Sequence, residues 1–159
     1  MAGYRLHLLG PPKFQTGAGD PVAIRSRKGI GLLAYLALAD GKPVGRDHLC
    51  ALLWSDRQTA QARASLRQLL VDLRQDFGPA SHVLDTSADG AISFSESGVE
   101  SDVAEFHRLR RADDRQNLEQ AFALRRGQFL EGLAPEDAAF AAEVGIKAFL
   151  WYSCHYFIP

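Results

Sequence analysis

Apolar residues alternate with polar ones at the start of the chain, which predicts strands before any helix. Residues 4–9 alternate loosely and end at a Gly-Pro-Pro stop. Residues 14–16 and 21–24 are short runs joined by a Gly-rich turn at 17–20, which indicates a hairpin. We therefore expect a small antiparallel sheet within the first 25 residues.

The spacing of apolar residues then changes to the 3.6-residue period of helices. Ser26 is a suitable N-cap for a first helix, which ends before a Gly-Lys-Pro stop. A second, shorter helix lies within Val44–Trp54 and opens at Arg46 or Asp47. Its inward-facing residues are Leu49, Leu52 and Leu53. Two helices separated by a short turn are thus expected after the sheet.

The clearest helical signal belongs to a third segment. It runs from Thr59, which can cap the helix, to a Gly-Pro pair at 78–79, which ends it. The apolar stripe of this segment consists of Ala62, Leu66, Leu69, Leu70, Leu73 and Phe77. Because these residues share one side of a helix, we expect the whole segment to pack along the core.

A second pair of short strands follows the third helix. Residues 82–84 and 91–94 flank a polar turn, Asp85–Gly90, and the Asp-Gly dipeptide at its end favours a hairpin. The order of antiparallel sheet, three helices and hairpin is that of an α+β winged helix-turn-helix domain, in which the hairpin is the C-terminal wing.

After the hairpin the apolar spacing is helical only. Two helices are marked by Val103, Phe106 and Leu109 and by Leu118, Phe122 and Leu124. The second of them ends at Gly127, and a further apolar segment covers Glu136–Ile158. The polar stretch Ser95–Glu100 separates this part from the first. We therefore expect two domains, a winged helix over residues 1–96 and an all-α segment over residues 97–159.

The positive and negative charges are also distributed unequally between the two parts of the chain. The chain of 159 residues has a net charge of −1, but residues 1–78 carry 11 Lys/Arg against 6 Asp/Glu, whereas residues 79–159 carry 7 against 13. With 47% apolar residues the composition excludes a disordered, collagen-like or disulfide-scaffold protein. A basic part joined to an acidic part is typical of a chain that binds a polyanion through one part only. We expect the acidic part to face away from that polyanion.

The start of the chain and its cysteines indicate a compartment. The opening residues lack the charged leader and sustained apolar run of a signal peptide, and no stretch reaches the roughly 18–20 apolar residues of a membrane span. Cys50 and Cys154 lie in different halves, without disulfide or metal spacing. We expect a reduced, cytoplasmic protein that makes no membrane contact.

No motif carries catalytic chemistry. The chain has no G-x-S-x-G sequence, and Gly17-Ala18-Gly19 is not followed by the helix that a phosphate loop needs. His48 with Cys50, and Cys154 with His155, supply too few ligands for a zinc site. We expect no enzymatic activity, no cofactor and no metal.

The third predicted helix has a second face beside its apolar stripe. The members of this face are Arg63, Ala64, Arg67, Gln68, Val71 and Arg74. Arginine offers a planar fork to guanine edges or phosphates, glutamine can pair with adenine, and a small alanine permits close approach to a base. The positive helix N-terminus, near Thr59, would favour a phosphate. The face therefore suits the major groove of DNA. The alternative is an ordinary solvated face, with Asp72 and Asp76 close enough to pair with some of the arginines.

A second basic cluster, Arg25, Arg27 and Lys28, lies at the start of the first helix. Cations at a helix N-terminus oppose the helix dipole and cost roughly 0.3–1 kcal/mol each. Binding of DNA phosphates would explain them. Alternatively, they lie before the helix and simply face water.

The turn of the predicted wing is acidic. It holds Asp85 and Asp89 and no Lys or Arg. A wing that contacts the minor groove would therefore do so through backbone amides, Thr86 or Ser87.

Three consecutive runs carry a family resemblance. They are IRSRKGIGLLAYLAL (Ile24–Leu38), GKPVGRDHLCALLWSD (Gly41–Asp56) and QARASLRQLLVDLRQDFG (Gln61–Gly78). Together they resemble the DNA-binding domain of the SARP-type bacterial transcriptional activators, a variant of the OmpR-type winged helix. Residues 101–133, with SDVAEFHRL and RGQFLEGL, resemble the start of the bacterial transcriptional activator domain, an all-helical, tetratricopeptide-like (TPR-like) module.

The resemblance implies a sequence-specific binder of double-stranded DNA that activates transcription. Such proteins often sit on direct repeats near a promoter and contact RNA polymerase. The resemblance places the recognition helix at residues 59–77, with Arg63, Arg67 and Gln68 facing DNA. It also implies backbone contacts from the second basic cluster, Arg25, Arg27 and Lys28.

The end of the chain departs from that family. From residue 141 it reads AAEVGIKAFLWYSCHYFIP, which does not align with the helical module. This apolar tail could complete the core, form a homodimer or reflect a truncation. A different class of function also stays open, a protein-interaction module that uses the winged helix and the acidic helical part as docking surfaces.

Overall fold

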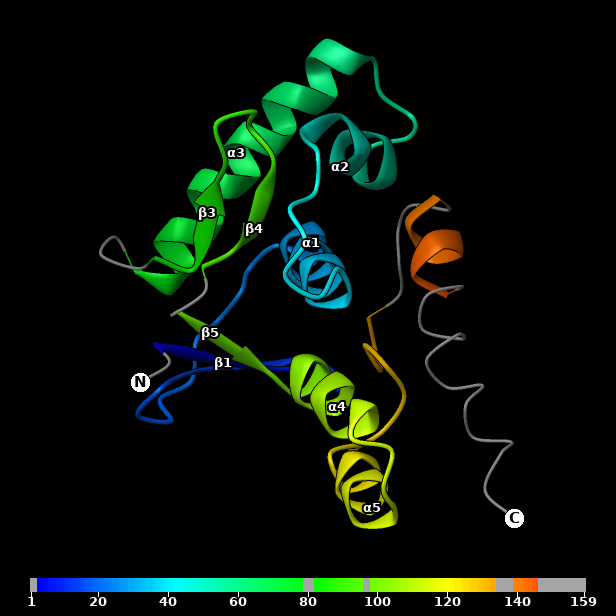
Figure 1. Ribbon diagram of the computed structural model, residues 1–159. Helices are drawn as coiled ribbons and strands as arrows, with labels where there is room; N and C mark the ends of the chain where they lie inside the picture. The colour runs from blue at the N-terminus through cyan, green and yellow to red at the C-terminus, as the bar shows by residue number, and fades with distance from the viewer. Residues whose placement is uncertain (1–2, 79–81, 96–97, 134–138, 146–159) are drawn as a thin grey trace.

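The computed structural model describes residues 3–78, 82–95, 98–133 and 139–145 (Figure 1). Its elements are β1 (Tyr4–His7), β2 (Lys13–Thr16), α1 (Arg27–Leu38), α2 (Arg46–Leu53), α3 (Thr59–Phe77), β3 (Leu84–Thr86), β4 (Ile92–Phe94), β5 (Val99–Ser101), α4 (Asp102–Arg111) and α5 (Arg115–Ala123). Residues 139–145 are also helical. Helix α1 lies in the middle of the molecule, between α2, α3 and the β3–β4 hairpin on one side and β1, β5 and α4 on the other (Figure 1).

Helix α1 begins where the sequence predicts. The Ser26 hydroxyl caps it by accepting a hydrogen bond from the Gly29 amide at 3.1 Å. From Gly31 to Leu38 every residue of α1 is buried. Gly31 allows this helix to be covered closely, because a Cβ placed there would lie 3.1 Å from the ring of Phe140. A glycine that weakens an isolated helix thus permits dense packing around the central one.

Helices α2 and α3 form the predicted helix-turn-helix pair. All six residues of the predicted apolar stripe of α3 are buried, and they are Ala62, Leu66, Leu69, Leu70, Leu73 and Phe77. Gly78 ends the helix with a φ of +100°, a conformation that favours glycine. The predicted cap is wrong by one residue. Gln58 is the N-cap, without a side-chain hydrogen bond, and Thr59 is the first helical residue.

The wing hairpin is shifted from its predicted position. The first strand was expected at residues 82–84, but β3 runs to Thr86, which pairs with Ile92 of β4. The turn is closed by the Ser87 amide, which donates to the Ala91 carbonyl at 2.9 Å. Backbone hydrogen bonds between Val44 and Ile92 add a bridge to the segment before α2. This contact across 48 residues fixes the register of β4, which no local pattern determines.

The N-terminal sheet is mixed, which corrects the expectation of an antiparallel sheet built from the first 25 residues. Strands β1 and β2 are antiparallel as predicted, but residues 21–24 add only an isolated bridge between Gln15 and Pro21. The third strand is β5, which pairs with β1 in parallel. Residues 99–101 are too short a run to indicate a strand by alternation, so only the partner strand reveals it.

A buried carboxylate joins β1 to α4. Asp102, 8% exposed, accepts hydrogen bonds from the Leu8 and Leu9 amides at 2.9 Å. Burial raises the pKa of Asp102, and these two amides lower it. The carboxylate satisfies backbone donors beyond the end of β1 and thereby ties that strand to the first residue of α4.

The helices after β5 agree in part with the predicted ones. Helix α4 buries Val103, Phe106 and Leu109, as predicted. Helix α5 starts after its N-cap Asp114 but ends at Ala123, earlier than the predicted Gly127. One hydrophobic core continues from α1–α3 into α4 and α5. The predicted domain boundary between residues 96 and 97 therefore stays a prediction. Residues 96–97 and most of the predicted 136–158 segment lie outside the described residues.

Residues 139–145 cover α1 and α2. Phe140 and Val144 are buried, and the Glu143 carboxylate accepts hydrogen bonds from the Tyr35 hydroxyl and from His48 Nε2, the latter at 3.0 Å. Burial raises the pKa of Tyr35, as do the hydrogen bond to Glu143 and its charge. The first part of the predicted apolar tail thus completes the core. Within the described residues, no helix has the length and apolar character needed to cross a membrane.

Candidate nucleic-acid interface

The outer face of α3 is formed by the residues that the sequence singles out. Arg63, Ala64, Arg67, Gln68, Val71 and Arg74 are all exposed. Because the opposite side of the helix is buried along its length, these side chains have no freedom to turn inward. Val71 is 43% exposed and is the one large apolar side chain classed as exposed among the described residues. The face therefore combines cations with a small apolar surface, a combination suited to base edges and thymine methyl groups.

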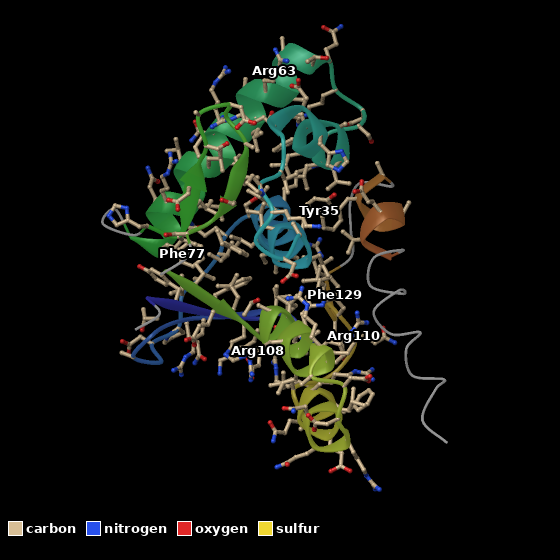
Figure 2. The ribbon with its side chains drawn as sticks, viewed as in Figure 1. Tyr35, Arg63, Phe77, Arg108, Arg110 and Phe129 are labelled. Carbon is tan, nitrogen blue, oxygen red and sulfur yellow. The ribbon has the colours of Figure 1, made fainter. Side chains whose placement is uncertain are left out.

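Arg63 lies in the N-terminal half of this face (Figure 2). It has a partner on α2, Asp47. Its Nε and Nη2 atoms donate to Asp47 Oδ1 at 3.0 and 2.9 Å. Both side chains are more than half exposed, at 54% for Arg63 and 73% for Asp47. The pair links the two helices of the helix-turn-helix at the surface.

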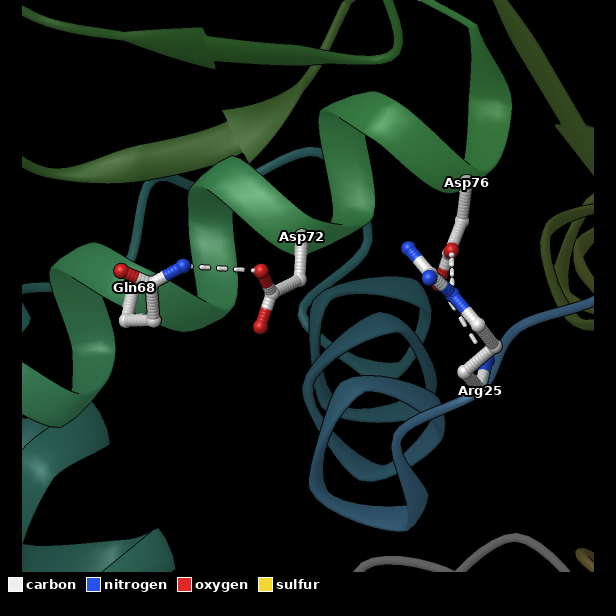
Figure 3. A network of polar contacts seen from close by, with 4 residues as sticks. All are labelled: Arg25, Gln68, Asp72 and Asp76. Carbon is white, nitrogen blue, oxygen red and sulfur yellow. Dashed lines mark hydrogen bonds and ion pairs between the residues drawn. The ribbon is translucent and has the colours of Figure 1, made fainter.

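The other two arginines of the face are not paired in this way. Within the described part of the chain, neither Arg67 nor Arg74 takes part in an ion pair or side-chain hydrogen bond. Asp72 and Asp76, considered above as partners for the arginines, have other contacts (Figure 3). Asp72 accepts a hydrogen bond from Gln68 Nε2 at 2.9 Å, so the amide of Gln68 is engaged on its own helix.

Arg25 contacts the C-terminal end of α3 (Figure 3). Its Nε donates to Asp76 Oδ1 at 2.6 Å, and its backbone amide donates to Oδ2 at 3.2 Å. The Asp76 side chain is only 4% exposed, whereas that of Arg25 is 69% exposed. Arg25 therefore neutralises a nearly buried carboxylate and still presents part of its guanidinium to solvent.

Lys28 has an intramolecular role that the sequence did not reveal. Its ammonium donates to the Leu53 carbonyl and lies 5.3 Å from the ring centroid of Trp54. A cation at the last carbonyls of α2 is favourable to that helix, which offsets its unfavourable place near the start of α1. Of the three residues in the predicted basic cluster, Arg25 and Arg27 are exposed, whereas Lys28 is half-buried.

The predicted phosphate contacts lie at both ends of α3. Thr59 is exposed at its N-terminus, whereas the side chain of Arg25 meets Asp76 near its C-terminus. The 19 residues of α3 span about 28 Å at 1.5 Å per residue. The structure therefore does not gather these residues into one site. Thr59 and Arg25 lie near opposite ends of α3, and Lys28 contacts the C-terminal end of α2.

The wing tip is acidic, but the structure brings a cation to it. Thr86 and Ser87 are exposed, and the Ser87 hydroxyl donates to Asp89, whose pKa this hydrogen bond lowers. Arg46, from the first turn of α2, donates through Nε to the Gly90 carbonyl at 2.8 Å. Sequence reasoning considered Arg46 only as a helix start. No local signal could assign it to the wing, because 44 residues separate it from Gly90.

Other site chemistry is sparse. Among the residues that the structure describes, no three His, Cys, Asp or Glu side chains gather in a metal-binding arrangement. Cys50 is buried in α2, and burial raises the pKa of its thiol, which disfavours a reactive thiolate.

Comparison with known proteins adds one informative similarity. The sequence matches no established family model and no curated protein. Among solved structures, the chain is similar to EmbR of Mycobacterium tuberculosis, solved in complex with a low-affinity phosphopeptide. The TM-score is 0.64 and the sequence identity 26%, over 94% of this chain and 44% of the EmbR chain. This chain therefore spans less than half the length of that protein. The similarity to EmbR, a SARP-family regulator, supports the resemblance seen in the sequence.

Proposed function

We propose that this chain is a sequence-specific, DNA-binding transcriptional regulator of the SARP type that inserts α3 into the major groove. The observation that carries the proposal is the outer face of α3, where exposed arginines lie opposite six buried apolar residues. The similarity to EmbR supports a regulatory role.

The residues of α3 divide into two roles along the helix. Recognition helices contact base edges mainly through their N-terminal residues. Arg63, Ala64 and Arg67 are therefore assigned to base edges, and Val71 to a thymine methyl group. Arg74, near the C-terminus, is assigned to a phosphate, as are the exposed parts of the Arg25 and Arg27 side chains.

The wing and the second part of the chain complete the proposed arrangement. Arg46 would place a cation beside the wing, so that Thr86 and Ser87 can approach the DNA backbone. Helices α4 and α5 lie on the other side of α1 from α2 (Figure 1). The acidic part would then face away from DNA and be available to RNA polymerase, and binding to direct repeats would place two copies side by side.

Selection of bound duplexes from a random pool tests the proposal with the whole chain. An enriched motif, repeated at a spacing near one or two helical turns of DNA, is expected. With phosphate contacts from Arg25, Arg27 and Arg74, the logarithm of affinity should fall with the logarithm of salt concentration at a slope of about −3. A flat salt dependence would contradict the proposal.

A pair of arginine variants locates the interface. Arg67→Ala should weaken binding to the selected duplex by about 10- to 100-fold, because a bidentate contact to a base is lost. Arg115→Ala is the matched control, since Arg115 is a 93% exposed arginine on α5, paired only with Glu119 in the described structure. Equal affinity of the two variants would place DNA elsewhere on the molecule.

One observation favours the alternative of a protein-interaction module. Arg63 and Arg25 already have carboxylate partners, so part of the basic surface is neutralised within the chain. A module of this kind would show no enriched duplex and would retain its partner when Arg67 is replaced. The same selection and the same variant therefore separate the two functions.

A further inference from the structure

The contact between Arg63 and Asp47 engages one particular edge of the guanidinium. An arginine has five N–H donors arranged in a planar fork. Asp47 Oδ1 accepts from Nε at 3.0 Å and from Nη2 at 2.9 Å, the two nitrogens of the lateral edge. The outer edge, formed by Nη1 and the second hydrogen of Nη2, is left for another partner. Guanine O6 and N7 are a pair of acceptors that such an edge can meet in the major groove.

The contact with Arg63 contributes too little to the stability of the fold to account for an aspartate at position 47. Exposed ion pairs contribute little to stability, and both partners are more than half exposed. An aspartate in the helix-turn-helix also repels DNA phosphates. Asp47 lies in the first turn of α2, where its negative charge stabilises the helix dipole. That stabilisation does not depend on its contact with Arg63 of α3.

The same face offers a direct contrast. Arg67 lies one turn further along α3 and has no such partner among the described residues. A free arginine loses side-chain freedom when it binds a base, whereas an arginine that is held beforehand loses less. The difference between the two residues is thus one of preorganisation.

We infer that Asp47 is a positioning residue that holds Arg63 with its outer edge directed at a guanine. Asp47 thereby determines base preference at one position of the site without contacting the base itself. The inference rests on the proposed function, and it names the residue pair that sets specificity at the N-terminal end of α3.

The test compares Asp47→Ala with the wild-type chain on the selected duplex, on the same duplex with each guanine replaced in turn, and on random duplex. At one position the preference for guanine should fall about 10-fold, the effect of losing one well-placed bidentate pair. Affinity for random duplex should rise, because a negative charge has been removed from the interface. Asp47→Asn, which keeps an acceptor oxygen, should restore part of the preference.

Two further variants make the result specific. Asp56→Ala removes an exposed aspartate from the turn before α3 that is not hydrogen-bonded to Arg63. It should raise affinity for random duplex and leave every base preference unchanged. Arg63→Ala should lose the preference at the same position, and adding Asp47→Ala to it should change nothing more at that position.

The contrary outcomes are distinct. Should Asp47→Ala tighten binding to all duplexes equally, like Asp56→Ala, Asp47 acts only as a repelling charge and the inference is overturned while the proposed function stands. The absence of any enriched motif for the wild-type chain overturns both. Circular dichroism of each variant verifies that α2 and α3 remain folded.

Discussion

Helices α3 and α4 each carry three arginines, yet the surroundings of the two sets differ. In α4 the last turn holds Arg108, Arg110 and Arg111, where cations favour the helix dipole. Figure 2 labels the first two of these residues. Arg108 is paired with Glu105 through Nε at 2.8 Å, and Arg111 is paired with Asp40 at the end of α1. The positions of these arginines are therefore accounted for by interactions within the folded chain.

The arginines of α3 are spread along one face instead of being gathered at the helix end. Only Arg74 lies in the last turn, and among the residues that the structure describes only Arg63 of the three has an ion pair. Arg67 lies in mid-helix, where the dipole gives a cation no advantage. A basic helix is a candidate for nucleic-acid binding when contacts within the folded chain do not account for its cations.

The largest expected effect concerns the start of α4. Replacing Asp102 with Ala leaves the Leu8 and Leu9 amides without their acceptor and should lower the free energy of unfolding by about 2–4 kcal/mol. Urea denaturation measures this change. The control is Asp72→Ala on α3, whose carboxylate accepts from Gln68 alone in the described part of the chain, and it should change stability by about 0.5 kcal/mol or less. Similar losses in both variants would show that α3 and α4 depend equally on their charged groups.

A smaller effect, dependent on pH, involves His107 of α4. Burial lowers its pKa from 6.5 to about 4, and Arg110 and Arg111 also lower it, whereas Asp40 raises it. The folded state therefore binds fewer protons than the unfolded state between these two values. The stabilisation is complete above pH 6.5 and is lost as the pH falls towards 4, by about 1–2 kcal/mol after allowance for solvent screening.

Chemical denaturation at a series of pH values measures this dependence. His107→Gln should flatten the curve relative to the wild-type chain over the same interval. A variant with the full wild-type slope between pH 6.5 and 4 would show that other groups, and not His107, bind the additional protons.

The smallest expected effect is a change in DNA affinity when an arginine in the last turn of α3 or of α4 is replaced. Arg74→Ala should weaken DNA binding about threefold on all sequences alike and reduce the salt slope by about 1, as expected for one lost phosphate contact. Arg108→Ala should leave DNA affinity unchanged, because its guanidinium is held by Glu105 on α4. Fluorescence anisotropy titrations at several salt concentrations compare the two. Equal losses of DNA affinity in the two variants would contradict the assignment of DNA binding to α3 and not to α4.

Much of the helical structure could be predicted from local spacing. The stripe from Ala62 to Phe77 is buried as expected, and Ser26 caps α1. These features depend on residues within one or two turns of each other, so the sequence shows them directly. The exposed face of α3 followed from the same spacing, because a helix that buries one side must expose the other. Its role in binding DNA stays a prediction.

The partners of the charged side chains could not be predicted in this way. Asp102 was not singled out, although it joins segments 94 residues apart. Lys28 and Gln68 were assigned to DNA, yet one contacts α2 and the other Asp72. The sequence offers several possible hydrogen-bond partners for each of these side chains. The packing of the helices and strands decides which partner lies within hydrogen-bond distance.

By itself, the sequence determined the order of the helices and of the wing hairpin, the buried and exposed sides of α3, and the separation of charge between the two parts of the chain. The tertiary structure alone decided that β5 joins β1, that Arg46 reaches the wing and that Asp47 holds Arg63. Periodicity and capping are properties of neighbouring residues, whereas these contacts join distant ones. They form only when the apolar faces of α1, α2 and α3 have packed together, since that packing sets which surface groups meet.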